Sequence, residues 1–174
     1  MSVSDLPDAA SDVRRRAERA SDDLAFALFR PHLFFYRPWT GSGEVTGPNG
    51  KRIAGFTVSG EGRARSREGH VVQEWRFDNG LSHVTEWKVL STDGRDYRAV
   101  DVRNGTEARG RQVGESFEWV MKVKGPTPFG QRTIKITTVY RLVSPVVAEA
   151  HTVSTVFGFI PINRMRATYR RVNG

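Results

Sequence analysis

The sequence of 174 residues contains no cysteine, which removes several classes of protein from consideration. Disulfide scaffolds, zinc–thiolate sites, iron–sulfur clusters and thiolate catalysis all require cysteine. The sequence also has no apolar run of about 18 residues, the length that a helix needs to cross a membrane. A hydrophobic share of 38% excludes a disordered chain and, at this length, is consistent with one packed domain.

Acidic residues are scarce in the C-terminal part of the sequence. Residues 1–87 contain 12 basic and 12 acidic side chains, whereas residues 88–174 contain 15 and 7. The net charge of +8 therefore comes from the second half, and after Glu118 the only acidic residue is Glu149. Such a basic protein can use these cations as a solvated outer face, or to meet an anionic membrane, an acidic partner or a polyanion.

Helical periodicity is confined to the N-terminus. The pattern predicts a helix over residues 8–30 that ends at Arg30-Pro31. It rests on apolar residues at steps of three and four, Val13, Ala17, Ala20, Leu24 and Ala27. Charged residues interrupt this segment, so it does not read as a secretory signal peptide, and we expect the chain as written to be cytoplasmic. A chain whose leader had been removed would look the same, which leaves an envelope location open.

Strand signals replace the helical period from residue 33 onward. Segments such as 117–123 and 134–142 alternate apolar and polar residues, and tight turns such as Asp78-Asn79-Gly80 and Asn104-Gly105 separate them. About nine or ten such strands are too many for one open sheet with a single apolar face. We therefore predict a mainly β chain with a lead-in over residues 1–32 and one domain over residues 33–174. That domain is an antiparallel up-and-down barrel of about 8–10 strands, favoured over a sandwich, with the N-terminal helix across one mouth or an outer face.

The apolar faces of the predicted strands converge inside such a barrel. The candidate lining residues are Trp75, Phe77, His83, Trp87, Trp119, Met121, Tyr140 and His151. Barrels of this size are either filled by side chains or hold one small ligand, so a packed core and a pocket both remain open. The pocket reading implies an apolar or amphipathic ligand such as an acyl chain, with a cation near the mouth meeting its head group.

The polar candidates are two histidines and two arginines. His83, or Glu149 together with His151, could support proton transfer if these side chains face the interior. Haem ligation by one of the histidines is a further alternative, but no pair of histidines has a metal-binding spacing, and we expect neither a metal nor a cofactor. Arg164 and Arg166 alternate with apolar residues and are expected to point outward. The opposite assignment would make them anion ligands inside the barrel.

An ordered set of glycines and aromatics carries a resemblance to a known family. The set runs through Gly43, Gly50-Lys51, Phe56-Thr57-Val58, Gly62, Glu74, Phe77-Asp78-Asn79-Gly80, Trp87, Trp119 and Phe157-Gly158. In order and spacing it resembles a bacterial family of unknown function, often described as lipoproteins, with a lipocalin-like (calycin) barrel. The resemblance covers roughly residues 34–171 and implies the barrel fold, a bacterial origin and a lipid-related role. The resemblance assigns no catalytic residue to this sequence. The chain departs from the family in lacking a lipid-modified cysteine and in reading Ala150-His151-Thr152 where relatives are rich in asparagine and arginine.

These observations rank three functions. The first is a non-enzymatic barrel that binds a small apolar or amphipathic, lipid-like molecule. The second is an isomerase, cyclase or hydrolase that uses an interior histidine. The third is a protein that binds an anionic membrane surface or a polyanion. Nucleic acid is not expected as a partner, because the chain lacks the combination of basic and stacking residues typical of RNA-binding modules.

Overall fold

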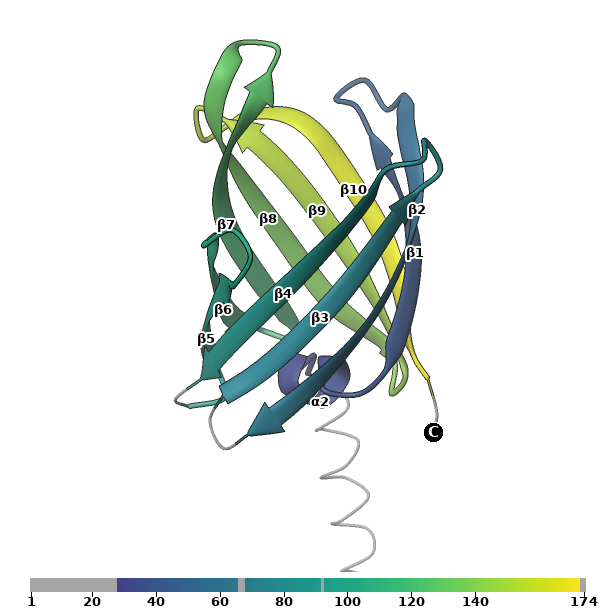
Figure 1. The fold of residues 1–174 in the computed structure, drawn as a ribbon, viewed down its shortest axis with the longest axis vertical. Helices are drawn as coiled ribbons and strands as arrows, with labels where there is room; N and C mark the ends of the chain where they lie inside the picture. Colours follow the sequence, from purple (N-terminus) through teal and green to yellow (C-terminus); the bar gives the residue numbers. More distant parts are fainter. Residues whose placement is uncertain (1–27, 66–67, 92, 173–174) are drawn as a thin grey trace, which may run out of the picture.

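The computed structural model describes residues 28–65, 68–91 and 93–172, and within them ten antiparallel strands form a closed barrel (Figure 1). Each strand pairs with the next one along the chain, and β10 pairs with β1 to close the barrel. The bounds are α2 Pro31–Phe35, β1 Trp39–Thr46, β2 Arg52–Arg65, β3 Glu68–Phe77, β4 Ser82–Ser91, β5 Asp96–Asp101, β6 Glu107–Val113, β7 Ser116–Thr127, β8 Gly130–Ser144, β9 Val147–Val156 and β10 Ile160–Arg171.

The predicted up-and-down barrel is confirmed, and strand register explains why the sequence alternates. Phe117 of β7 lies opposite Tyr140 of β8, and both side chains face the interior. The next pair, Glu118 and Val139, faces outward. Because successive residues of a strand point to opposite sides, one register fixes the inner and outer sets of the whole wall.

The helix boundary predicted at Arg30-Pro31 is wrong. Arg30 is extended and Pro31 occupies the first turn of α2, so this proline begins a helix. The first turn tolerates proline because its missing N–H has no partner within the helix there. Residues 28–30 are not helical, and the rest of the helix predicted over residues 8–30 lies outside the described residues.

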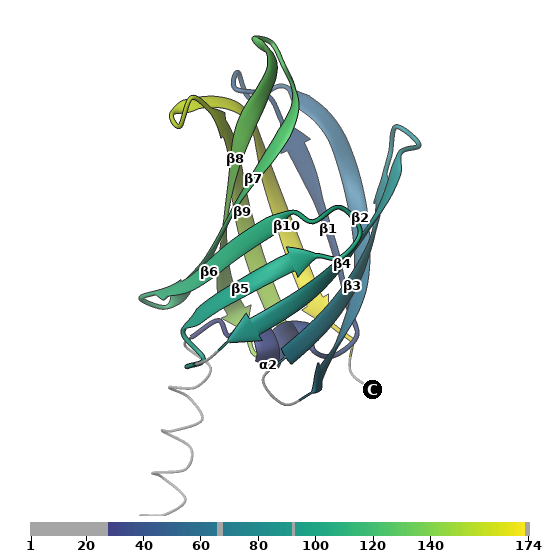
Figure 2. The ribbon, with the colours of Figure 1, turned by 60° about the vertical axis from the view of Figure 1, so that its left-hand side comes forward.

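One end of the barrel is closed by α2 (Figures 1 and 2). An aromatic layer packs there as part of the buried core. Phe29 stacks on Tyr140 with ring centroids 5.1 Å apart, and Phe35 meets Trp39 edge to face at 5.0 Å. Tyr169 of β10 packs against Trp39 at 5.4 Å. Rings at such offset and edge-on distances pack favourably, and together they form a solid floor.

The wall of the barrel is lower between β4 and β7 than elsewhere (Figure 2). β5 and β6 have 6 and 7 residues, whereas β4 has 10 and β7 has 12. β4 pairs with β5 only from Trp87 to Ser91, and β7 pairs with β6 only as far as Met121. The turn that joins β5 to β6 therefore ends part-way up the wall, below the hairpins on either side.

Candidate functional site

The interior of the barrel contains a cavity of about 430 Å³. Its floor is Pro31, Phe35 and Tyr36 at the end that α2 closes. At the other end it reaches the level of His83 and Val123, just inside the open hairpins. Most of its wall is apolar, with side chains contributed by nearly every strand, and this is the composition typical of small-molecule sites.

The large inward-facing side chains around this cavity are only partly buried. Trp75, Trp87, Trp119, Met121 and Tyr140 all pack against the core, yet each keeps some accessible surface. The aromatic side chains at the floor have less accessible surface. Phe117 and Tyr169 face the same interior but are almost completely buried. The partial exposure arises because these side chains border empty space inside the wall. They are therefore placed to contact a molecule in the cavity.

Four polar lining residues bond to one another across adjacent strands. Thr85 of β4 donates a hydrogen bond of 3.0 Å to the side-chain oxygen of Gln73 on β3. The hydroxyls of Thr138 and Thr152, on β8 and β9, lie 2.9 Å apart. Each of these hydrogen bonds lowers the cost of placing polar groups on the inner wall.

A buried carboxylate stands where the low part of the wall ends. Asp101, the last residue of β5, is only 1% exposed and lines the cavity together with Asn104 and Thr106 of the following turn. Its carboxylate accepts a hydrogen bond of 3.0 Å from the backbone N–H of Arg103 and another of 3.0 Å from the side-chain amide of Asn104. These bonds hold the β5–β6 turn in place and fix the carboxylate at the edge of the cavity.

The charge of the cavity is decided by few groups. Among the described residues that line it, no lysine or arginine is present, and Asp101 is the only carboxylate. Burial raises the pKa of Tyr140 to about 12 and, together with the nearby Tyr97, that of Tyr36 to about 12. Both phenols therefore stay neutral at physiological pH and can donate hydrogen bonds.

Six of the eight predicted lining residues meet at this cavity. They are Trp75, His83, Trp87, Trp119, Met121 and Tyr140. Phe77 also faces inward, but it packs on Phe56, with ring centroids 5.9 Å apart, nearer the open end and outside the cavity lining.

His151, Arg164 and Arg166 lie on the outside of the barrel. His151 is exposed and lies between the buried Ala150 and Thr152, so its predicted place in the lining is wrong. Alternation explains the outcome, since the small side chains at 150 and 152 occupy the inner face. Arg166 pairs in register with His151, and Arg164 reaches the carbonyl of Pro48 at 3.4 Å, so neither arginine provides an interior anion site.

Sequence reasoning missed the polar residues at the edge of the cavity. Asp101 continues the inward set of Tyr97 and Ala99, so strict alternation along β5 could have identified it. The turn predicted at Asn104-Gly105 does not identify Asn104 or Thr106 as lining residues, because nothing local indicates that this turn ends beside an interior space. The contribution of α2 could not be read from a pattern that placed the helix earlier in the chain.

The described residues contain no cluster of three histidine or acidic side chains that could hold a metal ion. None of the helices in the described ranges has the length and apolar character needed to cross a membrane.

Comparison with known proteins places the sequence in a family. Residues 17–160 match a family described as a protein of unknown function, DUF3833. The chain belongs to this family. No curated protein matches the sequence of this DUF3833 protein.

Solved structures similar to the DUF3833 chain are barrels of distant sequence. The S-type phycobiliprotein lyase CPES from Guillardia theta has a TM-score of 0.56 at 6% identity, covering 79% of this chain and 88% of its own. Two further structures are EF1p2_mFAP2b bound to DFHBI, with a TM-score of 0.43, and the redesigned β-barrel mFAP1 bound to DFHBI, with 0.42. Both are 12% identical and cover 82% of this chain, and 97% and 98% of their own. At such low identity the likeness to CPES supports the barrel fold alone.

Proposed function

We propose that this DUF3833 protein binds one small, mostly apolar, lipid-like molecule inside its barrel. The observation that carries the proposal is the ring of partly exposed tryptophan, tyrosine and methionine side chains around a cavity of about 430 Å³. That volume lies within the range of roughly 300–1,000 Å³ usual for small-molecule sites. Transfer of an apolar molecule from water to these walls would bury apolar surface on both partners.

The polar lining favours a ligand with a neutral or cationic polar group. An anionic head group would enter a space that has the Asp101 carboxylate at its edge and no arginine or lysine among the described lining residues. Burying a charge without an opposite partner is costly. Alcohol, amide or amine groups could instead bond to Asp101, Asn104 or His83. The head-group cation expected from the sequence therefore forms no part of this proposal.

Binding is favoured over catalysis. Of the acid–base candidates, Glu149 and His151 are exposed on the outer wall, away from the cavity. His83 borders the cavity, but no hydrogen bond within the described residues joins it to a carboxylate that would orient its ring.

A second candidate partner, an anionic membrane surface, is favoured by the cations around the open end of the barrel.

The proposal is tested by fluorescence titration with N-phenyl-1-naphthylamine, a neutral apolar probe. Three of the four tryptophans line the cavity, so energy transfer to bound probe should be strong and should saturate at one probe per chain. Competition with dodecanol, dodecylamine and dodecanoate then tests the head group, because the three share one chain length. We expect the alcohol and the amine to displace the probe at least tenfold more effectively than the carboxylate.

Two results would count against this function. Absence of saturable probe binding would remove the cavity as a ligand site. Saturable binding with dodecanoate as the best competitor would keep the site but overturn the proposed head group.

A further inference from the structure

We propose that the open end of the barrel docks on an anionic lipid surface through the tips of the β7–β8 and β9–β10 hairpins. The rim is defined as the four hairpins opposite α2, residues 46–53, 76–83, 122–135 and 155–164 (Figure 1). The docking itself does not depend on what the cavity holds. Docking would let an apolar molecule pass between the bilayer and the cavity, and this part of the inference rests on the proposed function.

Three phenylalanines project from two neighbouring hairpin tips. Phe129, in the β7–β8 turn, is 44% exposed, and Phe157 and Phe159, in the β9–β10 turn, are 55% and 75% exposed. The rings of Phe129 and Phe157 meet edge to face with centroids 5.7 Å apart. An exposed aromatic cluster of this kind is costly in water and typical of surfaces that insert into the lipid interface.

Phe157 occupies a backbone position that suits other residues better. Its φ is 53°, and Gly158 after it has φ 82°, while the N–H of Phe159 bonds to the carbonyl of Val156. Turns with positive φ at both central residues favour Asn-Gly or Gly-Gly, and a bulky side chain there is unusual. The chain therefore keeps an exposed phenylalanine at a site where asparagine would fold with less strain.

Cations surround these aromatic tips. The rim contains eight basic side chains, Lys51, Arg52, Arg76, Lys122, Lys124, Arg132, Lys135 and Arg164, against one carboxylate, Asp78. Asp78 is paired with Arg52, and Arg76 with Glu74, which leaves six without a carboxylate within salt-bridge distance among the described residues. Arg132 lies 5.8 Å from the centre of the Phe157 ring, so charge and aromatic surface occur together.

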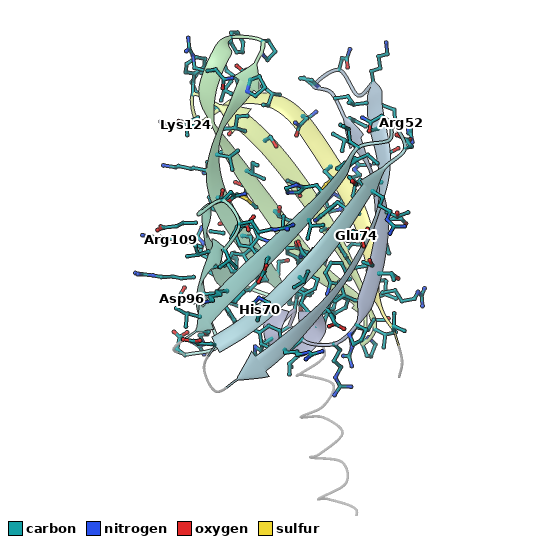
Figure 3. The ribbon with its side chains drawn as sticks, in the orientation of Figure 1. Arg52, His70, Glu74, Asp96, Arg109 and Lys124 are labelled. Atoms are coloured by element: carbon teal, nitrogen blue, oxygen red, sulfur yellow. The ribbon has the colours of Figure 1, made fainter. Side chains whose placement is uncertain are left out.

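The opposite end of the barrel has mixed charge. Exposed carboxylates at or near its turns include Glu68, Asp93, Asp96 and Glu115, and exposed cations there include Arg30, Arg37, Arg95 and Arg170. Figure 3 shows Lys124 and Arg52 towards the rim end and Asp96 towards the end closed by α2. Because the excess of cations lies at the rim, the molecule would approach an anionic bilayer with its rim first.

A lipid surface fits the rim better than a single-stranded nucleic acid. The cations are spread over four separate hairpins, and the phenylalanines lie at the tips of two of them. Nucleic-acid sites instead line a basic groove in which bases stack one after another. Lys122 and Lys124 also lie on the part of β7 that pairs with β8 but, beyond Met121, no longer with β6, and lysine protects such a strand edge. Protection of a strand edge by these lysines would not explain why Phe157 and Phe159 are exposed.

The test is sedimentation of the full chain with vesicles of phosphatidylcholine alone or mixed equally with phosphatidylglycerol, at low and high salt. We expect binding to the mixed vesicles at low salt and weaker binding at high salt. The variant F157N/F159S should bind at least tenfold more weakly, and K124E/R132E should lose about fivefold or more for each charge changed.

Matched controls lie on the outer wall. Leu90 and Val100 are exposed apolar residues of β4 and β5, and Arg98 and Arg109 are exposed and paired in register on β5 and β6. L90S/V100S and R98E/R109E should keep vesicle binding within twofold of the wild type. Equal losses in the rim and wall variants, no binding of the wild type to anionic vesicles, or tighter binding to a single-stranded oligonucleotide would each overturn the proposal. N-phenyl-1-naphthylamine binding by the rim variants, measured without vesicles, separates failure of docking from failure of the cavity.

Discussion

Trp87 on β4 lies opposite Asp101 on β5, and this pair marks the level at which the barrel wall ends between β4 and β7. Below it the wall is continuous down to α2. Above it the backbone N–H of Val102 bonds to the carbonyl of Glu86, and the Arg103 guanidinium reaches the carbonyl of Val84 at 3.4 Å. A cavity lined by tryptophans thus has a polar edge held in place by one buried carboxylate.

Replacing Ala108 by Phe should block the cavity without unfolding the barrel. Ala108 is 4% exposed, faces inward and lines the cavity opposite Met121 in the register of β6 and β7. A larger side chain there would fill empty space, so we expect the free energy of unfolding to stay within about 1 kcal/mol of the wild type. Chemical denaturation measures this quantity. V100F, on the outer wall, is the matched control, and a loss of several kcal/mol in A108F alone would indicate that the interior is already full.

Asp101→Ala should destabilise the protein more than Asp93→Ala. Both carboxylates accept backbone hydrogen bonds in turns, Asp101 from Arg103 and Asp93 from Arg95 and Asp96. Asp93 is exposed, so water can replace it. Asp101 is buried, and its removal leaves the Arg103 N–H without its acceptor, which costs about 1–3 kcal/mol. Equal effects in urea denaturation would mean that water reaches the β5–β6 turn freely.

Stability should fall at alkaline pH because the folded protein keeps Tyr140 protonated. Burial raises the pKa of Tyr140 from 10.0 to about 12, and that of Tyr169 is raised well above its ordinary value for the same reason. Between pH 10 and 12 the unfolded chain loses the Tyr140 proton while the folded chain retains it, so the free energy of unfolding decreases as pH rises. The Tyr140 contribution is about 3 kcal/mol over this range. Thermal unfolding from pH 9 to 12 should show a shallower decline in Y140F, and parallel curves for the two proteins would contradict the assignment.

Phe157→Asn should leave the fold as stable as the wild type or more stable. Relief of the positive φ at this position gains about 1 kcal/mol, while the exposed contact with Phe129 is lost. We expect the melting temperature to stay level or rise. F159N is the comparison, since no positive φ is relieved there. A clear decrease in F157N alone would show that the ring contact stabilises the hairpin more than the backbone strain destabilises it.

The barrel could be predicted because its determinants are local. Alternation along segments such as 134–142 and turns such as Asn104-Gly105 depend on near neighbours, and antiparallel pairing of successive strands follows from them. The prediction of the helix boundary at Arg30-Pro31 is wrong for a physical reason. Proline is favoured both just after a helix and at its first turn, so Pro31 alone does not distinguish an end from a beginning.

The candidate site could be predicted only in part. Sequence indicated which face of β7 points inward, but Phe117 on that face is sealed in the floor while Trp119, two residues on, borders the cavity. Whether rings from many strands fill the interior or leave it hollow depends on their packing across the whole barrel. His151 was misplaced because its inward neighbours Ala150 and Thr152 are small and give a weak hydrophobic signal.

The most direct test of the central claim is titration of N-phenyl-1-naphthylamine into the wild type, A108F and V100F. Probe binding is measured by energy transfer from tryptophan. The account predicts saturation at one probe per wild-type chain and at least tenfold weaker binding in A108F, with V100F unchanged. Equal binding in all three proteins, or no saturable binding in any, would contradict a ligand site inside the barrel.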